Sequence, residues 1–118
     1  MMALHHLAFR TADVAALASF YREMFGFEVV RDALPKSLWL ALGADAVLMI
    51  EARTDAETPI AAGSMELVAF RADERTLSHV RERARERDCY DGETPFTVYV
   101  RDPDGRRIGV SNYRLRED

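Results

Sequence analysis

The sequence predicts an α+β fold made of two similar halves, and three observations support that prediction. Two segments of the sequence end in the same three residues, Ala-Phe-Arg: residues 4–10 (Leu-His-His-Leu-Ala-Phe-Arg) and residues 65–71 (Met-Glu-Leu-Val-Ala-Phe-Arg). They lie 61 positions apart, which is close to half of the 118-residue chain. Both segments alternate with the period of two that is typical of β-strands. An Ala-Asp pair and then a helical pattern follow each of them. Because an internal repeat in a sequence indicates a repeated structural unit, we expect each half to consist of a strand, a helix and further strands.

The first half contains one amphipathic helix among its strands. After the strand at 4–11, Asp13 is placed to cap a helix by accepting hydrogen bonds from its first N–H groups. Gly26 ends that helix, as glycine does at the left-handed position after a helix. Apolar residues share one face of the helix: Val14, Leu17, Tyr21 and Met24. Three further strands are expected at 27–31, 38–42 and 46–53, the last two forming a hairpin.

The second half repeats the pattern after a turn-rich linker at 54–63. Asp73 repeats the helix cap, and the helix that follows has a narrow apolar stripe with mixed charges elsewhere, which indicates a solvated face. Asp91-Gly92 is expected to form a turn, and the Asp-Pro-Asp-Gly sequence at 102–105 a second, tighter turn. The remaining strands are expected at 96–101 and 107–113.

Length and composition predict a single domain, residues 1–118. The chain has 16 Lys and Arg against 20 Asp and Glu, a net charge of −4, which argues against nucleic-acid binding. Its longest apolar runs have five residues, far below the ~20 that a membrane span needs, and the N-terminus lacks a secretory pattern. The single cysteine, Cys89, fits a reducing compartment, so we expect a cytoplasmic protein without a membrane partner.

Two segments resemble a known superfamily. The first is Leu-His-His-Leu-Ala-Phe-Arg-Thr-Ala-Asp at 4–13 with Phe-Tyr-Arg-Glu-Met-Phe-Gly-Phe at 20–27, and the second is Tyr-Val-Arg-Asp-Pro-Asp-Gly-Arg-Arg-Ile at 99–108. They resemble the opening and the closing strands of vicinal-oxygen-chelate proteins: glyoxalases, extradiol dioxygenases, bleomycin-resistance proteins and fosfomycin-resistance thiol transferases. The layout is most similar to the last group, and the resemblance covers residues 3–114.

The resemblance implies a glyoxalase-like fold. It consists of two βαβββ modules in tandem, at about 3–54 and 64–114 with a linker at about 55–63, whose mixed sheets curl into a cup around a small-molecule ligand. Chains of this size in the superfamily usually pair, so the resemblance also implies a homodimer.

The resemblance also implies where a metal would bind. In the superfamily's enzymes one divalent ion lies in the cup, held by His, Glu or Gln from the first strand and a late strand of each module. Carried onto this chain, the four positions are His6, Met49 or Glu51, Leu67 and Gly109. Leu67 and Gly109 offer no donor, so the implied metal site is incomplete and the protein is expected to bind its ligand without a metal, as bleomycin-resistance members do.

Two other functions stay open, and with them whether the protein is an enzyme. A one-residue bulge would turn Glu66 inward, and His6, Glu51 and Glu66 would then hold Mn, Fe, Ni or Zn in a lyase, dioxygenase or thiol transferase. His5 would not join them, because neighbouring strand residues face opposite sides. The other alternative is a non-catalytic association module with a vestigial cup. No sequence pattern identifies a catalytic residue.

The remaining pocket candidates are charged or aromatic. Arg10 and Arg71 occupy equivalent places in the repeat and share the parity of His6, so they are expected either to attract an anionic ligand or to form salt bridges at the rim. Trp39 and Tyr99 are expected to line the cup or to pack in the core. The candidate lining is therefore Arg10, Trp39, Met49, Leu67, Arg71, Tyr99 and Gly109.

Overall fold

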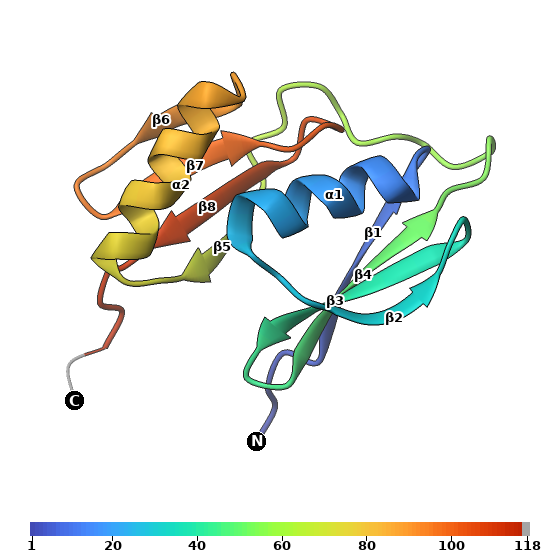
Figure 1. The fold of residues 1–118 in the computed structure, drawn as a ribbon, viewed down its shortest axis with the longest axis horizontal. Helices are drawn as coiled ribbons and strands as arrows, with labels where there is room; N and C mark the ends of the chain where they lie inside the picture. Colours follow the sequence, from blue (N-terminus) through green and yellow to red (C-terminus); the bar gives the residue numbers. More distant parts are fainter. Residues whose placement is uncertain (117–118) are drawn as a thin grey trace. The chain divides into compact units, whose positions relative to one another are not determined.

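A computed structural model describes residues 1–116 of the chain. The chain divides into two compact units, Met1–Pro59 and Ile60–Asp118. Each unit has one four-stranded sheet and one helix, in the chain order strand, helix, strand, strand, strand (Figure 1). The predicted α+β fold with two βαβββ modules is therefore confirmed.

The first unit places its first and last strands side by side. Its sheet has the order β1-β4-β3-β2, in which β1 and β4 are parallel and the other neighbours antiparallel. The helix α1 lies along one face of this sheet (Figure 1). The elements are β1 (His6–Thr11), α1 (Val14–Phe25), β2 (Val29–Ala33), β3 (Ser37–Gly43) and β4 (Ala46–Ala52).

The second unit repeats this topology. Its sheet has the order β5-β8-β7-β6, with β5 and β8 parallel and the other pairs antiparallel. The elements are β5 (Leu67–Arg71), α2 (Glu74–Glu86), β6 (Tyr90–Glu93), β7 (Thr97–Arg101) and β8 (Arg107–Ser111). The 61-residue repeat in the sequence therefore corresponds to a repeat of structure.

Both helices begin at the predicted caps. The Asp13 carboxylate accepts from the Ala16 N–H at 3.0 Å, and the Asp73 carboxylate accepts from the Thr76 N–H at 2.8 Å. Gly26 follows α1 with a φ of 73°, the left-handed conformation that glycine adopts without strain. No helix within residues 1–116 is long and apolar enough to cross a membrane.

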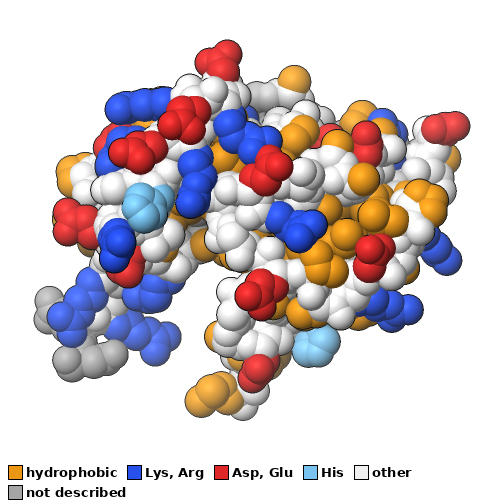
Figure 2. Space-filling view, viewed as in Figure 1, with side chains coloured by type: hydrophobic (Ala, Val, Ile, Leu, Met, Phe, Trp, Pro, Cys, Tyr) orange, Lys and Arg blue, Asp and Glu red, His pale blue; other side chains and the backbone are white. Residues whose placement is uncertain are grey.

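Each core lies between the helix and one face of the sheet. In the first unit, apolar residues of α1 such as Leu17 and Met24 are buried with Leu40, Leu48 and Ile50 of the strands. In the second unit the buried hydrophobic side chains include Leu77, Val80, Ala84, Val98, Val100, Ile108 and Val110. The outer side of α2 carries mixed charges (Figure 2), so the predicted solvated face is confirmed.

Two predicted boundaries are wrong. Asp91 and Gly92 lie inside β6 and not in a turn. Gly92 has a φ of 99°, and the register of β6 against β7 shifts there, so the glycine accommodates an irregularity within the strand. The chain reverses later, where the Thr94 hydroxyl accepts from the N–H groups of Phe96 and Thr97. The strand expected at 27–31 is displaced to Val29–Ala33.

Candidate functional site

Each sheet has a face opposite its helix, which we call the open face. Along the strands of the first unit, residues buried under α1 alternate with residues that point to this open face. The open face of the first unit is formed by His6, Ala8, Arg10, Ser37, Trp39, Ala41, Val47, Met49 and Glu51. Two predicted metal ligands, His6 and Glu51, share this face.

The strand register separates His6 from Glu51. His6 is paired with Val47, and Glu51 is paired with Arg10 at the other end of the same two strands. Four residues along a strand correspond to about 13 Å. Met49 lies between them, beside Ala8. The first unit therefore does not bring its two predicted ligands together.

Arg10 and Glu51 belong to an ion-pair cluster instead. The Arg10 guanidinium donates to both carboxylate oxygens of Glu57, at 2.8 and 3.0 Å, and lies 3.6 Å from Glu51. Hydrogen bonds from Arg10 and from the Thr54 N–H lower the pKa of Glu57 to about 2. The rim salt bridge expected for Arg10 is therefore present. Sequence reasoning missed Glu57, because it lies in the linker, where no periodicity fixes its direction.

The aromatic candidate of the first unit, Trp39, is covered by an arginine. The Arg31 guanidinium lies 4.8 Å from the centre of the Trp39 ring, and Met49 is paired with Trp39 on the adjacent strand. The indole Nε1 is buried and has no hydrogen-bond partner within residues 1–116.

The two neighbouring histidines are closer together than expected. His5 precedes β1, so the alternation of the strand does not apply to it. The Nδ1 atoms of His5 and His6 lie 2.9 Å apart, and the rings meet edge to face. The expectation that the two rings point to opposite sides is therefore wrong.

In the second unit, Leu67 and Gly109 occupy neighbouring places on the open face. A Cβ atom added at Gly109 would lie 3.5 Å from Leu67 Cδ1, 3.4 Å from Ala69 Cβ and 3.3 Å from Thr97 Cγ2. Gly109 itself is buried. The two positions at which the resemblance implies metal ligands are therefore neighbours, and carbon atoms of Leu67, Ala69 and Thr97 surround the place of a side chain at Gly109.

Glu66 does not lie on this strand. β5 begins at Leu67, and its pairing with β8 runs without a shift from Leu67 to Arg71. The Glu66 N–H donates to the Ser64 hydroxyl at 3.3 Å. The bulge that would turn Glu66 inward is not present in β5.

Sequence reasoning missed the charged cluster on the same open face. Asp91 Oδ2 accepts from the Nε atoms of both Arg101 and Arg107, at 2.9 and 3.0 Å. The Arg107 guanidinium also lies over the ring of Tyr99, 3.8 Å from its centre. A signal was available, because Arg107 precedes Gly109 by two residues and so shares its face.

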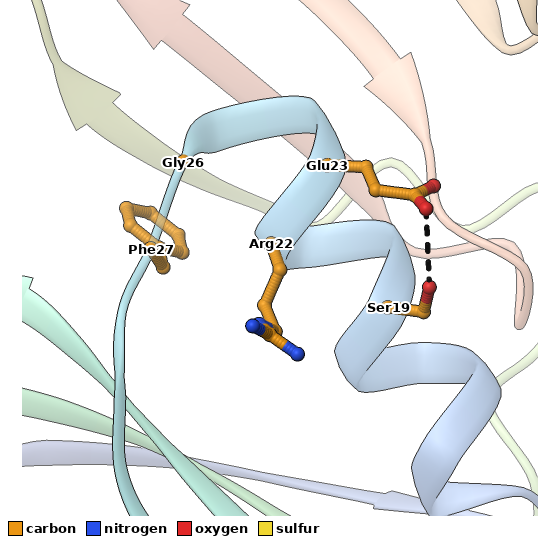
Figure 3. A pocket seen from close by; sticks show the side chains of 5 residues that line it. All are labelled: Ser19, Arg22, Glu23, Gly26 and Phe27. Atoms are coloured by element: carbon orange, nitrogen blue, oxygen red, sulfur yellow. Dashed lines mark hydrogen bonds between the residues drawn. The ribbon is translucent and has the colours of Figure 1, made fainter.

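Two hollows of the surface lie at Arg71 and at the end of α1. Arg71 lines one of them with residues of the C-terminal segment, Arg114, Leu115 and Arg116. A second hollow lies at the end of α1 (Figure 3), where Ser19 Oγ donates to Glu23 Oε1 at 3.4 Å. Its lining residues belong to α1 and the segment after it, so it lies on the helix side of the first unit.

The donor set does not fit a metal within either unit. Residues 1–116 contain no group of three His, Cys, Asp or Glu side chains placed to hold one ion. On the open faces, the positions implied for metal binding hold His6, Met49 or Glu51, Leu67 and Gly109. Of these, His6 and Glu51 carry a nitrogen or oxygen donor, and they lie at opposite ends of the β1–β4 pair.

Comparison with known proteins relates the chain to one superfamily. The family model for the Glyoxalase/Bleomycin resistance protein/Dioxygenase superfamily matches residues 3–110. No curated protein sequence matches the chain.

Solved structures share the fold. Lactoylglutathione lyase from Agrobacterium tumefaciens is 23% identical, with 92% of each chain covered and a TM-score of 0.70. The oxidase ChaP-H1 is 18% identical over 99% of this chain and 100% of that one, with a TM-score of 0.79. A variant of the fosfomycin resistance protein FosX from Listeria monocytogenes, complexed with Mn(II) and 1S,2S-dihydroxypropylphosphonic acid, is 16% identical over 98% and 95%, with a TM-score of 0.80.

Proposed function

The chain belongs to the glyoxalase/bleomycin resistance protein/dioxygenase superfamily, and on that basis we propose that it binds a small organic molecule on an open face without a complete metal centre. One observation carries the proposal: Leu67 and Gly109 meet on the open face of the second unit, at the two positions where the superfamily pattern implies metal ligands.

The surroundings of Gly109 support a site without a metal. A glutamate at this position would first have to fit its Cβ 3.3 Å from the Thr97 methyl group, which is closer than side chains normally approach. The position is therefore tightly surrounded for a side chain and holds no metal donor. A ligand on this face would meet Leu67, which is 42% exposed, together with the ring of Tyr99 and the guanidinium of Arg107.

Metal titration tests the proposal. Chelator-treated protein is titrated with Mn, Fe, Ni and Zn by calorimetry, with the single variants His6→Ala, Glu51→Ala and Glu66→Ala beside the wild type. We expect that none of the four ions binds to the wild type at a site that is lost in all three variants. One tightly held ion per chain, lost in each of the three variants, would overturn the proposal in favour of the metal-dependent enzyme.

Weak metal binding by the neighbouring rings of His5 and His6 is tested with a separate control variant. His5 and His6 present two ring nitrogens 2.9 Å apart, and such a pair binds Ni or Zn weakly on its own. We expect His5→Ala to remove any such weak binding, since His5 lies outside the open face. Binding that survives in His5→Ala and disappears in His6→Ala would instead indicate a site on the open face.

A ligand screen tests the binding function itself. Small organic molecules are screened by thermal shift in the presence of a chelator, against the wild type and Leu67→Trp. Leu34→Trp is the matched control, because Leu34 is 43% exposed in the first unit and Leu67 is 42% exposed. We expect ligands that stabilise the wild type and Leu34→Trp but not Leu67→Trp. Ligands that stabilise all three proteins equally would place the site elsewhere.

The homodimer is part of the same proposal. Its support is the superfamily to which the chain belongs, together with exposed apolar side chains near β1 and β5, such as Leu4 and Met65. Sedimentation equilibrium is expected to give twice the mass of the 13.4 kDa chain, and a monomer across the micromolar range would refute this part.

A further inference from the structure

We propose that the open face of the second unit binds an organic oxyanion, a carboxylate or a phosphoryl group, through the guanidinium of Arg107. This inference rests on the small-molecule function proposed above and names the chemical class of its ligand. Its basis is a difference between two arginines that share one carboxylate.

Arg101 is fully engaged by the protein. Its Nε donates to Asp91, one terminal nitrogen donates to the carbonyl oxygens of Ser64 and Gly105 at 2.6 and 3.1 Å, and the other lies 3.5 Å from the Met65 sulfur. These bonds fasten the segment before β5 and the turn before β8 to the sheet. Arg101 therefore has a structural role.

Arg107 is held in place but keeps free donors. Its Nε donates to Asp91, and the central carbon of its guanidinium lies over the Tyr99 ring, 3.8 Å from the ring centre. Neither of its terminal nitrogens donates to any group within residues 1–116, although the side chain is only 17% exposed. Both nitrogens reach the surface, since within residues 1–116 the buried side-chain donor without a partner is the indole Nε1 of Trp39. An oxyanion would satisfy both at once, in the two-point geometry that guanidinium favours.

The charge of this face also favours an anion. Among the strand residues that the structure describes on this face, the acidic one is Asp91, which is shared between Arg101 and Arg107, while Arg71 lies on the same face along β5. Three positive charges against one negative leave a local excess in a chain whose net charge is −4. Arg71 lies four residues along β5 from Leu67, the register partner of Arg107, which corresponds to about 13 Å. It therefore adds to the positive potential of this face but is too far away to contact the same anionic group.

The apolar neighbour of Arg107 defines the rest of the ligand. Leu67 is the register partner of Arg107 across the β5–β8 pair and is 42% exposed. The combination of an anchored guanidinium and an exposed leucine fits an oxyanion that carries a hydrocarbon group, and an inorganic anion would leave the leucine uncovered.

Calorimetry on the metal-free full-length chain tests this inference. The probes are benzoate and phenyl phosphate, with benzyl alcohol as a neutral molecule of similar shape. We expect one or both anions to bind and benzyl alcohol to bind more weakly. Arg107→Met, which keeps an apolar side chain of similar length, is expected to weaken anion binding about ten-fold or more. The matched control is Arg75→Met, an exposed arginine of α2 in the same unit, which is expected to change affinity less than two-fold.

A second substitution at Arg107 and a substitution at Leu67 distinguish a failure of the oxyanion inference from a failure of the proposed small-molecule function. Arg107→Lys retains the positive charge and loses the planar guanidinium with its two-point geometry, so we expect its affinity for the anion to lie between those of the wild type and Arg107→Met. If Arg107→Met fails to fold, Arg107→Lys provides the test. If Leu67→Trp abolishes anion binding and both Arg107 variants bind like the wild type, the small-molecule site stands and the role of Arg107 is overturned. If neither anion binds, the oxyanion inference is overturned, and the screen of neutral ligands still decides the proposed function.

Discussion

Arg10 of β1 and Glu57 of the linker form a two-point ion pair, with both carboxylate oxygens accepting from one guanidinium at 2.8 and 3.0 Å. The pair joins the first strand to the segment that follows the last strand of the same unit. It also explains why Arg10 is a poor candidate for ligand binding, since Glu57 and Glu51 already surround it.

The ion pair makes the first unit sensitive to acid. Because the pKa of Glu57 is lowered from 4.5 to about 2 in the folded chain, its contribution to stability is complete above about pH 4.5 and is lost as the pH falls toward 2. Urea unfolding of wild type and Glu57→Gln at several pH values measures this. We expect the two curves to converge at low pH, and a constant difference down to pH 2 would refute the ion-pair explanation.

Asp102 is predicted to be the most sensitive polar residue of the second unit. It is 4% exposed and accepts from the N–H groups of Asp104 and Arg106 at 2.9 and 3.0 Å and from the Arg106 guanidinium at 3.3 Å. Asp102→Ala leaves these donors without their acceptor and is expected to lower the free energy of unfolding by about 2 kcal/mol. Asp102→Asn keeps one acceptor oxygen and should lose clearly less in the same urea titration.

Gly109 and Thr97 are predicted to be energetically coupled. Gly109→Ala brings a Cβ within 3.3 Å of the Thr97 methyl group and is expected to destabilise the protein by about 1 kcal/mol. Thr97→Ser removes that methyl group and retains a hydroxyl for the bond with Ser111, which is 2.7 Å long. In the Thr97→Ser background, Gly109→Ala should therefore be neutral or stabilising. Additive effects in the double-mutant cycle would contradict the contact.

Cys89 is predicted to react slowly with alkylating reagents. Burial raises the pKa of its thiol, so a smaller fraction is thiolate at pH 8 than in an unfolded chain. Alkylation by iodoacetamide should be slower in native protein than in urea, and the difference should shrink as the pH rises. Equal rates in both states would show that the thiol is neither buried nor perturbed.

The repeat and the periodicity were sufficient to predict the architecture. The matching segments around Phe9 and Phe70, the caps at Asp13 and Asp73 and the stop at Gly26 all depend on local chemistry, so each could be recognised in isolation. The irregular strand around Gly92 could not, because a glycine with positive φ serves a turn and a bulge equally well.

The site was harder to predict, because its contacts depend on register. The resemblance implied that Leu67 and Gly109 share a face, but nothing in the sequence placed His6 and Glu51 at opposite ends of one strand pair. The sharing of Asp91 between Arg101 and Arg107 joins residues from three strands. No pattern within a single segment reports such a contact.

The order of strands within each sheet has a consequence for synthesis on the ribosome. β4 and β8 are the last strands of their units to be made, yet each lies inside its sheet, between the first strand and the one before it. The nascent sheet therefore gains one of its two inner strands last, and β5 has no partner strand within its sheet until β8 emerges. A chain that ends prematurely before Arg107 would lose the middle of the second sheet and not merely its edge, so truncated products would expose unpaired strands and become substrates for chaperones and proteases.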